Sequence, residues 1–284
     1  MKHRFLYRGR MAPSPSGYLH LGHVATFLCA RKRAGDGVLI LRNDDLDPHR
    51  SQGRFVDAFL EDLKWLGIRW DEGPDIGGPF EPYSQSQRRS FYLDAWQVLK
   101  AGNFIYPCPH SRKDIQHVAE APHGSASIFP VTLRSHPEAG SAYTSPEGIN
   151  WRFRVPDGES IIFDDERLGP QSYLAGKDFG DFVLWNRDNI PAYELAAVCD
   201  DHAMNITEIV RAEDLLVSTA RQILLYRALG WVLPAFFHTP LVCDNFGERL
   251  AKRHDALSIR ILRERGHSPE SVLKMAEAYI SDSV

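Results

Sequence analysis

The chain has 284 residues, enough for one large domain or two small ones, and 43% of them are hydrophobic, which can fill a proper core. Its net charge of −4 excludes a general nucleic-acid coat, although a local basic patch could still bind nucleic acid. We find no apolar run of membrane-spanning length and no secretion signal, so we expect a cytoplasmic protein. Four scattered cysteines without a C-x-x-C pair predict neither a disulfide framework nor an ordinary zinc knuckle.

The first third of the chain alternates predicted strands and helices. Short apolar runs predict buried strands, helical spacing of large apolar residues predicts helices, and the Pro-Ser-Pro-Ser-Gly segment between the first two elements predicts a loop. In chain order we expect a strand over 6–11, a helix over 24–33, a strand over 37–42, and helices near 55–66 and 86–100. Strand, helix, strand predicts an α/β fold with a doubly wound parallel sheet.

The composition changes near Tyr106, where prolines, glycines, serines and short β-type runs at 150–155 and 160–163 predict an inserted α+β domain. Strand and helix patterns then resume, with runs at 181–185, 192–198 and 206–210, a helix over 218–229, a strand at 241–243, a helix near 255–265, and a last helix from the N-cap Ser268 to about Ile280. We therefore divide the chain into residues 1–105, the insertion 106–180, residues 181–246, and a helical end over 247–284.

Two histidines, His20 and His23, stand where the first predicted helix begins. A helix N-terminus offers backbone N–H groups and a positive dipole end, so it stabilises a phosphate, and two imidazoles three residues apart can reach one anion. A zinc site is the first alternative, but no third ligand lies nearby and the general-base Glu of metalloproteases is absent. The second alternative is a proline-rich loop in which the histidines have no function. The spacing alone favours neither this loop nor phosphate binding.

The segment from Arg10 to His23 resembles the first signature of class I aminoacyl-tRNA synthetases, in the Arg-x-Ala-Pro-Ser-Pro-x-Gly form of the glutamyl and glutaminyl branch. The resemblance implies a Rossmann-like catalytic core over residues 1–105 and 181–246. It also implies that ATP, with Mg²⁺ as its companion ion, is contacted by Ser14, His20, Gly22 and His23, with both histidines catalytic. It places Arg10, Met11, Ala12, Pro13 and Ser14 beside the amino acid.

Three later positions match segments that contact the amino acid in this branch. Asp44 follows the second predicted strand and aligns with the Glu of the family's Arg-Ile-Glu-Asp-x-Asp motif, which is associated with the substrate ammonium; its side chain is one methylene shorter, so the amino-acid preference stays open. Tyr193 and Arg211 match the other two segments, and guanidinium groups can bind a carboxylate with two hydrogen bonds. An isolated arginine at a strand end more often forms a surface ion pair. Ala212 stands where the family usually has Gly.

Residues 248–254 resemble the KMSKS loop, the second class I signature. The resemblance implies that Leu250 and Lys252 contact ATP and that Lys252 is catalytic. Arg249 and Ala251 depart from the family's first Lys and its Ser. Without the resemblance, a basic run in a loop is most often simply solvated.

The insertion carries remnants of a segment that holds zinc in many relatives. Cys108 and His110 could ligate a metal, but Phe129 and Leu133 stand where a Tyr and a Cys are expected, and neither can bind zinc. We therefore expect an apolar core in place of a metal, with His123 and His136 as the only other ligands within reach in the sequence.

The resemblance extends from Arg10 to the loop around Lys252, and the short relatives that it matches are the glutamyl-Q tRNA(Asp) synthetases. It implies a monomer that activates L-glutamate with ATP in the absence of tRNA and transfers it to queuosine in the anticodon loop of tRNA(Asp). The chain ends soon after Lys252, so we do not expect the helical anticodon-binding region of full glutamyl-tRNA synthetases. Two alternatives remain: an adenylate-forming ligase with another amino acid or acceptor, and a non-catalytic paralogue that binds an amino acid or nucleotide. The retained His20 and His23 disfavour the latter.

Overall fold

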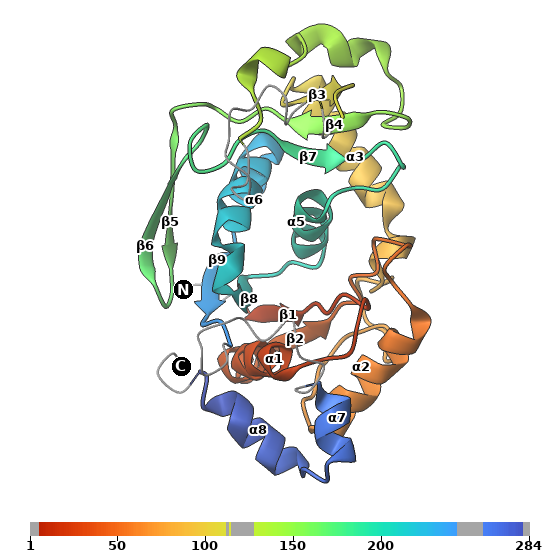
Figure 1. The fold of residues 1–284 in the computed structure, drawn as a ribbon, viewed down its shortest axis with the longest axis vertical. Helices are drawn as coiled ribbons and strands as arrows, with labels where there is room; N and C mark the ends of the chain where they lie inside the picture. Colours follow the sequence, from red (N-terminus) through yellow and green to blue (C-terminus); the bar gives the residue numbers. More distant parts are fainter. Residues whose placement is uncertain (1–5, 112–113, 115–127, 243–257, 281–284) are drawn as a thin grey trace.

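The computed structural model describes residues 6–111, 114, 128–242 and 258–280, which form a mixed α/β fold with parallel strands near its middle (Figure 1). The strands are β1 (Arg8–Met11), β2 (Val38–Leu41), β3 (Ile105–Cys108), β4 (Asn150–Phe153), β5 (Ser160–Asp165), β6 (Gly169–Leu174), β7 (Phe182–Trp185), β8 (Glu208–Ala212) and β9 (Ala235–Thr239). The helices are α1 (Leu21–Ala34), α2 (Gly53–Trp65), α3 (Arg89–Ala101), α5 (Tyr193–Ala203), α6 (Leu216–Leu229), α7 (Ile259–Glu264) and α8 (Pro269–Glu277). Short 3₁₀ turns cover Gln85–Gln87, Val131–Leu133, Pro137–Ala142 and Glu213–Leu215.

The parallel strands come from distant parts of the chain. β1 pairs with β2 from Arg8↔Val38 to Met11↔Leu41, and β8 pairs with β9 over its full length. A hydrogen bond from the main-chain N–H of Thr207 to the carbonyl of Arg8 (2.9 Å) holds the start of β8 beside β1. The predicted α/β fold with parallel strands is therefore confirmed, and these strands direct their carboxyl ends to the same region.

Antiparallel pairing surrounds this parallel centre. The sheet β3-β4-β7 lies at one end of the molecule, opposite α7 and α8 (Figure 1). The hairpin β5-β6 joins β9 through one parallel pair, Asp165↔Phe236. Because β7 follows residue 180 and pairs with β4, the antiparallel sheet takes strands from both sides of the predicted boundary. The division into domains stays a prediction.

The strand predicted over 241–243 is wrong for the part that the structure describes. Residues 241 and 242 are not in a strand, Cys243 lies outside the described residues, and the strand that pairs with β8 is β9 at Ala235–Thr239. β9 lies between Pro234 and Pro240, and Pro240 ends it because proline has no N–H for the ladder. This strand was not predicted from the sequence because prolines flank it and the polar His238 follows its two phenylalanines, although both phenylalanines are buried.

The last helices begin at serine caps. The Ser268 side chain accepts a hydrogen bond from the N–H of Ser271, with proline in the first helical position, as predicted. α8 ends at Glu277, three residues earlier than predicted. Within the described ranges, we find no helix with the length and apolar character needed to cross a membrane.

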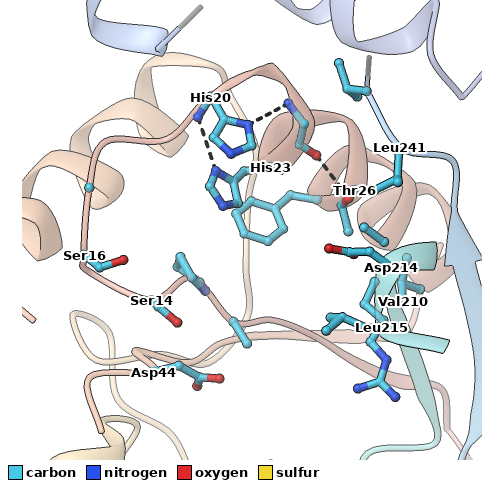
Figure 2. A pocket seen from close by; sticks show the side chains of 18 of the residues that line it. Ser14, Ser16, His20, His23, Thr26, Asp44, Val210, Asp214, Leu215 and Leu241 are labelled. Carbon is cyan, nitrogen blue, oxygen red and sulfur yellow. Dashed lines mark hydrogen bonds between the residues drawn. The ribbon is translucent and has the colours of Figure 1, made fainter. Parts of the chain in front are cut away.

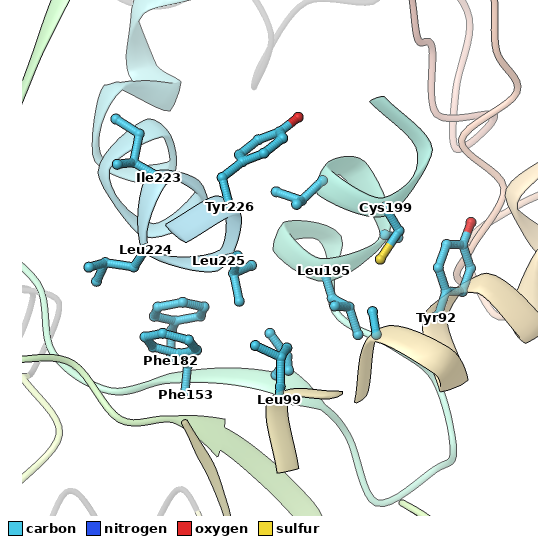
Figure 3. Close-up of a cluster of buried hydrophobic side chains, with 14 of the residues drawn as sticks. Tyr92, Leu99, Phe153, Phe182, Leu195, Cys199, Ile223, Leu224, Leu225 and Tyr226 are labelled. Carbon is cyan, nitrogen blue, oxygen red and sulfur yellow. The ribbon is translucent and has the colours of Figure 1, made fainter. Parts of the chain in front are cut away.

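A large apolar core joins α3, α5 and α6 to the antiparallel sheet (Figure 3). Leu99 of α3, Leu195 of α5 and Leu225 of α6 are fully buried there, against Phe153 and Phe182 of β4 and β7. This packing fixes α5 relative to α3, and α5 carries Tyr193, which lines the cavity described below.

We expect Leu195→Ala to lower the free energy of unfolding by about 2–5 kcal/mol, because it removes a fully buried side chain and leaves a cavity. Urea denaturation measures the change. Val98→Ala is the control: Val98 lies on α3 but is 52% exposed, so its truncation should cost less than about 0.5 kcal/mol. Equal losses for both variants would contradict the assigned core.

Candidate functional site: a cavity at the carboxyl ends of the parallel strands

A cavity of about 750 Å³ lies between the beginning of α1 and the carboxyl ends of the parallel strands (Figure 2). Residues from four of these strand ends line it: Ala12 follows β1, Asp44 follows β2, Ala212 ends β8, and Pro240 follows β9. Ligands of parallel α/β sheets bind at this edge. The fold therefore brings together segments that lie about two hundred residues apart in the chain.

Ten of the residues predicted as site residues line this one cavity: Arg10, Ala12, Pro13, Ser14, His20, Gly22, His23, Asp44, Tyr193 and Arg211. Met11 does not line it, because strand alternation turns its side chain into the hydrophobic core, where it is fully buried. Leu250 and Lys252 lie outside the described residues. Lining residues that the sequence analysis did not single out include Thr26, Leu215 and Ser258, none of which belongs to a chemical motif.

The two histidines form the N-terminal cap of α1. The Nδ1 atom of His20 accepts a hydrogen bond from the N–H of Gly22 (3.1 Å), and Nδ1 of His23 accepts from the N–H of His20 (3.3 Å). An imidazole that accepts at Nδ1 carries its proton on Nε2, so the geometry assigns both rings as neutral Nε2–H donors. A helix end that already attracts anions thus gains two side-chain donors suited to phosphate.

Gly22 makes this cap possible by its lack of a side chain. A Cβ atom at this position would lie 3.0 Å from Cε1 and 3.1 Å from Nδ1 of His20, closer than real contacts of this kind normally come. Any larger residue would therefore push the His20 ring away from the helix end. The predicted beginning of a helix near the histidines is confirmed, with His20 as the N-cap.

Arg42 lies at the centre of a buried ionic network under the cavity. Its Nε and Nη2 atoms donate to the two carboxylate oxygens of Asp44 (2.6 and 3.2 Å), and its Nη1 donates to Asp201 (2.7 Å). Arg42 is fully buried, and the carboxylates around it hold the pKa of its guanidinium well above the ordinary value, although burial works in the opposite direction. No role was predicted for Arg42 from the sequence.

Two further arginines complete the network from other elements. Arg10 of β1 donates through Nε to Asp201 (3.1 Å) and through Nη1 to the carbonyl of Val210 (3.1 Å). Arg88, the N-cap of α3, donates to Asp200 (2.6 Å). Three guanidinium groups thus meet three carboxylates, and each of the six residues is less than a tenth exposed. Pairing of this kind offsets the cost of removing these charges from water.

Asp44 is the carboxylate of this network that reaches the cavity. Burial raises its pKa to about 6, and the two hydrogen bonds from Arg42 only partly offset that effect. The pKa of Asp201, in contrast, is lowered: burial would raise it, but Arg10 and Arg42 both favour the ionised form. Asp44 is therefore the member of the pair whose charge changes near neutral pH.

Arg211 of β8 differs from the other buried arginines. It is 4% exposed and lines the cavity, and within the described part of the chain no carboxylate forms an ion pair with it. Its hydrogen-bond acceptors are the Thr219 hydroxyl (2.6 Å), Nε2 of His238 (3.3 Å) and the Tyr193 hydroxyl (3.4 Å), all uncharged. A buried guanidinium without a counter-ion predicts an anionic ligand at this end of the cavity. Thr219 and His238 carried no sequence signal.

The remnant zinc segment is an apolar cluster. Cys108 is fully buried and packs with Tyr106 and Phe129, with Leu133 against them. Among the described residues, no three His, Cys, Asp or Glu side chains are grouped closely enough to hold a metal ion, although His123 lies outside them. The expected apolar core is present, and the absence of zinc stays a prediction.

Comparison with known proteins gives the family. Residues 7–278 match the model of the class I tRNA synthetases (E and Q), catalytic domain. The chain belongs to this family. It is 45% identical to the glutamyl-Q tRNA(Asp) synthetase of Symbiobacterium thermophilum, over 97% of this chain and 87% of that protein, and 43% identical to the one of Nitratidesulfovibrio vulgaris, over 92% and 82%.

Solved structures agree with this assignment. The glutamate–tRNA synthetase of Elizabethkingia anophelis matches the fold with a TM-score of 0.82 at 29% identity, covering 95% of this chain and 61% of that chain. The methionyl-tRNA synthetase of Mycobacterium tuberculosis matches with a TM-score of 0.54 at 13% identity, a likeness of fold alone. The expected family and the class I catalytic fold are therefore confirmed.

We expect elemental analysis of the purified protein to give far less than one zinc per chain. Because Cys108 packs as an apolar residue, Cys108→Val should change the free energy of unfolding by less than about 1.5 kcal/mol. His110→Ala is a second test of the same point, since losing a ligand of a structural zinc would unfold its surroundings. One zinc per chain, lost together with stability in Cys108→Val, would show that the remnant segment is a metal site.

Proposed function

We propose that this protein activates L-glutamate with ATP, in the absence of tRNA, and transfers the glutamate to queuosine in tRNA(Asp). The observation that carries the proposal is one cavity with a capped, anion-attracting helix end on one side and Arg211 on the other, whose guanidinium has no carboxylate partner among the described residues. ATP and an acidic amino acid are the two ligands that such a cavity suits. The names of the 45% and 43% identical relatives support the acceptor.

The amino-acid end of the cavity has complementary charges for glutamate. A carboxylate can bind Arg211, whose present partners are all neutral, and the ammonium can approach Asp44. Arg10 lines the same end but already pairs with Asp201, so we propose that it contributes to the field around the substrate more than to a new ion pair. Tyr193 closes this end from the first turn of α5.

The ATP end is formed by His20, His23 and the first turn of α1. In the proposed reaction, a carboxylate oxygen of glutamate attacks the α-phosphorus of ATP, a new O–P bond forms, and the bond to the leaving pyrophosphate breaks. The Nε2–H donors and the helix end stabilise the charge that develops on the phosphates. Mg²⁺ enters with ATP, and Leu250 and Lys252 are proposed to complete this end. The adenylate then passes glutamate to queuosine with loss of AMP.

We further propose that residues 106–180 bind the acceptor as an insertion into the catalytic core, and that the protein acts as a cytoplasmic monomer. Both proposals rest on the resemblance to the synthetase family.

We expect glutamate-dependent exchange of pyrophosphate into ATP without tRNA, and charging of tRNA(Asp) only when it carries queuosine. Arg211→Gln should reduce exchange at least about a hundredfold, because a buried charge that meets the substrate is lost. Arg227→Gln is the matched control, since Arg227 is an exposed arginine on α6 paired with Glu159. All twenty amino acids are screened, and the tRNA without queuosine is the matched substrate control.

Exchange with another amino acid and none with glutamate would reject glutamate as the substrate. Exchange with glutamate but no queuosine-dependent charging would leave an adenylate-forming ligase with a different acceptor.

We expect glutamate affinity to fall as the pH falls through about 6, approaching tenfold per pH unit, with ATP absent. The sign follows from the raised pKa of Asp44: above it the carboxylate attracts the ammonium, and below it the neutral acid does not. Calorimetry between pH 5 and 8 measures the effect, and Asp44→Asn should bind weakly with little pH dependence. A wild-type affinity that stays constant across this range would contradict the role of Asp44.

A further inference from the structure

The contacts behind Arg211 are unusual because they hold a buried cation without neutralising it. Nη2 of Arg211 donates to Oγ1 of Thr219 at 2.6 Å, and Nε donates to Nε2 of His238 at 3.3 Å. Thr219 and His238 are both fully buried. Elsewhere under the cavity the buried arginines have carboxylate partners, as Arg10 and Arg42 do with Asp201.

His238 can accept from Arg211 only in one protonation state, and Asp165 fixes that state. Nδ1 of His238 lies 2.6 Å from Oδ2 of Asp165, and the main-chain N–H of His238 donates to the same oxygen at 3.0 Å. A carboxylate so close to Nδ1 keeps the ring proton there, which leaves Nε2 as the acceptor. Burial and the nearby Arg211 guanidinium lower the pKa of His238, so the ring is neutral at neutral pH.

Thr219 supplies the second uncharged acceptor from the facing helix. Its hydroxyl accepts from Arg211 and can donate its one proton to Nε2 of His238 (2.9 Å) or to the carbonyl of Leu215 (3.1 Å). Threonine is short and stiff on a helix, so the oxygen position is well fixed. The hydroxyl and the imidazole together accept from the Nε and Nη2 atoms of the guanidinium.

We propose that Thr219 and His238 are positioning residues that aim the Arg211 guanidinium into the cavity and leave its charge uncancelled for a substrate carboxylate. Asp165 acts indirectly, because it fixes the tautomer of His238. A carboxylate in place of the hydroxyl would pair with Arg211 inside the protein, as Asp201 pairs with Arg10, and would repel the substrate. The inference rests on the proposed function, because it explains how this end of the cavity selects a carboxylate.

The test compares Thr219→Asp with Thr219→Asn, two side chains of the same shape that differ in charge. Amino-acid-dependent pyrophosphate exchange gives KM and kcat for glutamate and KM for ATP, and thermal melting checks the fold. We expect Thr219→Asp to raise KM for glutamate at least about tenfold above that of Thr219→Asn, with KM for ATP within about twofold in both. A purely structural role would affect the two variants equally.

A second pair covers the case in which both larger side chains disturb the fold. Thr219→Val keeps the shape but removes the acceptor, and Thr219→Ser keeps the hydroxyl. We expect KM for glutamate to rise about tenfold in Thr219→Val and to stay within about threefold of wild type in Thr219→Ser. Equal KM values for Asp and Asn, or for Val and Ser, would overturn the inference.

The same assay separates this inference from the function on which it rests. If the wild-type protein shows no glutamate-dependent exchange, the proposed function fails first. If the wild type is active but the charge at residue 219 has no specific effect on KM for glutamate, only the positioning role fails.

Discussion

The pairing of Arg42 with Asp44 and Asp201 is the interaction on which the rest of the site depends. Arg42 follows β2, Asp44 is two residues further on, and Asp201 comes from α5, so one guanidinium joins the parallel strands to a helix from the other half of the chain. Removing one partner of such a buried pair typically costs about 3–5 kcal/mol, because a charge is left without compensation. The network therefore fixes the floor of the cavity in one arrangement, which a purely apolar floor would define less strictly.

Charge balance gives this floor its functional meaning. Arg10, Arg42 and Arg88 each form an ion pair with a buried carboxylate, so none of them needs a ligand anion as its counter-ion. Arg211 lies close to them in the fold but meets only neutral acceptors among the described residues. In the proposed function, the free energy needed to bury Arg211 without an ion pair among these residues is recovered when a carboxylate binds. We base the proposed carboxylate site on this difference between Arg211 and the paired arginines, and not on the number of arginines.

Much of the cavity could be predicted from the sequence because its residues belong to compact motifs at the ends of strands or shortly after them. His20, His23, Asp44 and Arg211 are of this kind, and all four line the cavity. The residues that orient them could not be predicted, since their partners are distant in the chain: Asp201 meets Arg42 only after α5 packs against α3. Thr219 and His238 are ordinary helix and strand residues until the tertiary fold places them behind Arg211. β9 was missed because two prolines flank it. Strand alternation directs the Met11 side chain into the core, and its predicted contact with the amino acid stays a prediction.

We propose that the histidine pair uses the same hydrogen bonds for folding and for phosphate recognition. Each ring accepts a main-chain N–H at Nδ1, so forming the cap of α1 also places the ring proton on Nε2. A protonated imidazole could no longer accept at Nδ1, and it would bring a positive charge to the positive end of the helix. The cap therefore favours neutral rings before any ligand is bound, and the donors are oriented without further ordering of the chain. Pre-orientation of this kind is what stabilising a transient charge on a phosphate requires, because groups that must first reorganise stabilise it less.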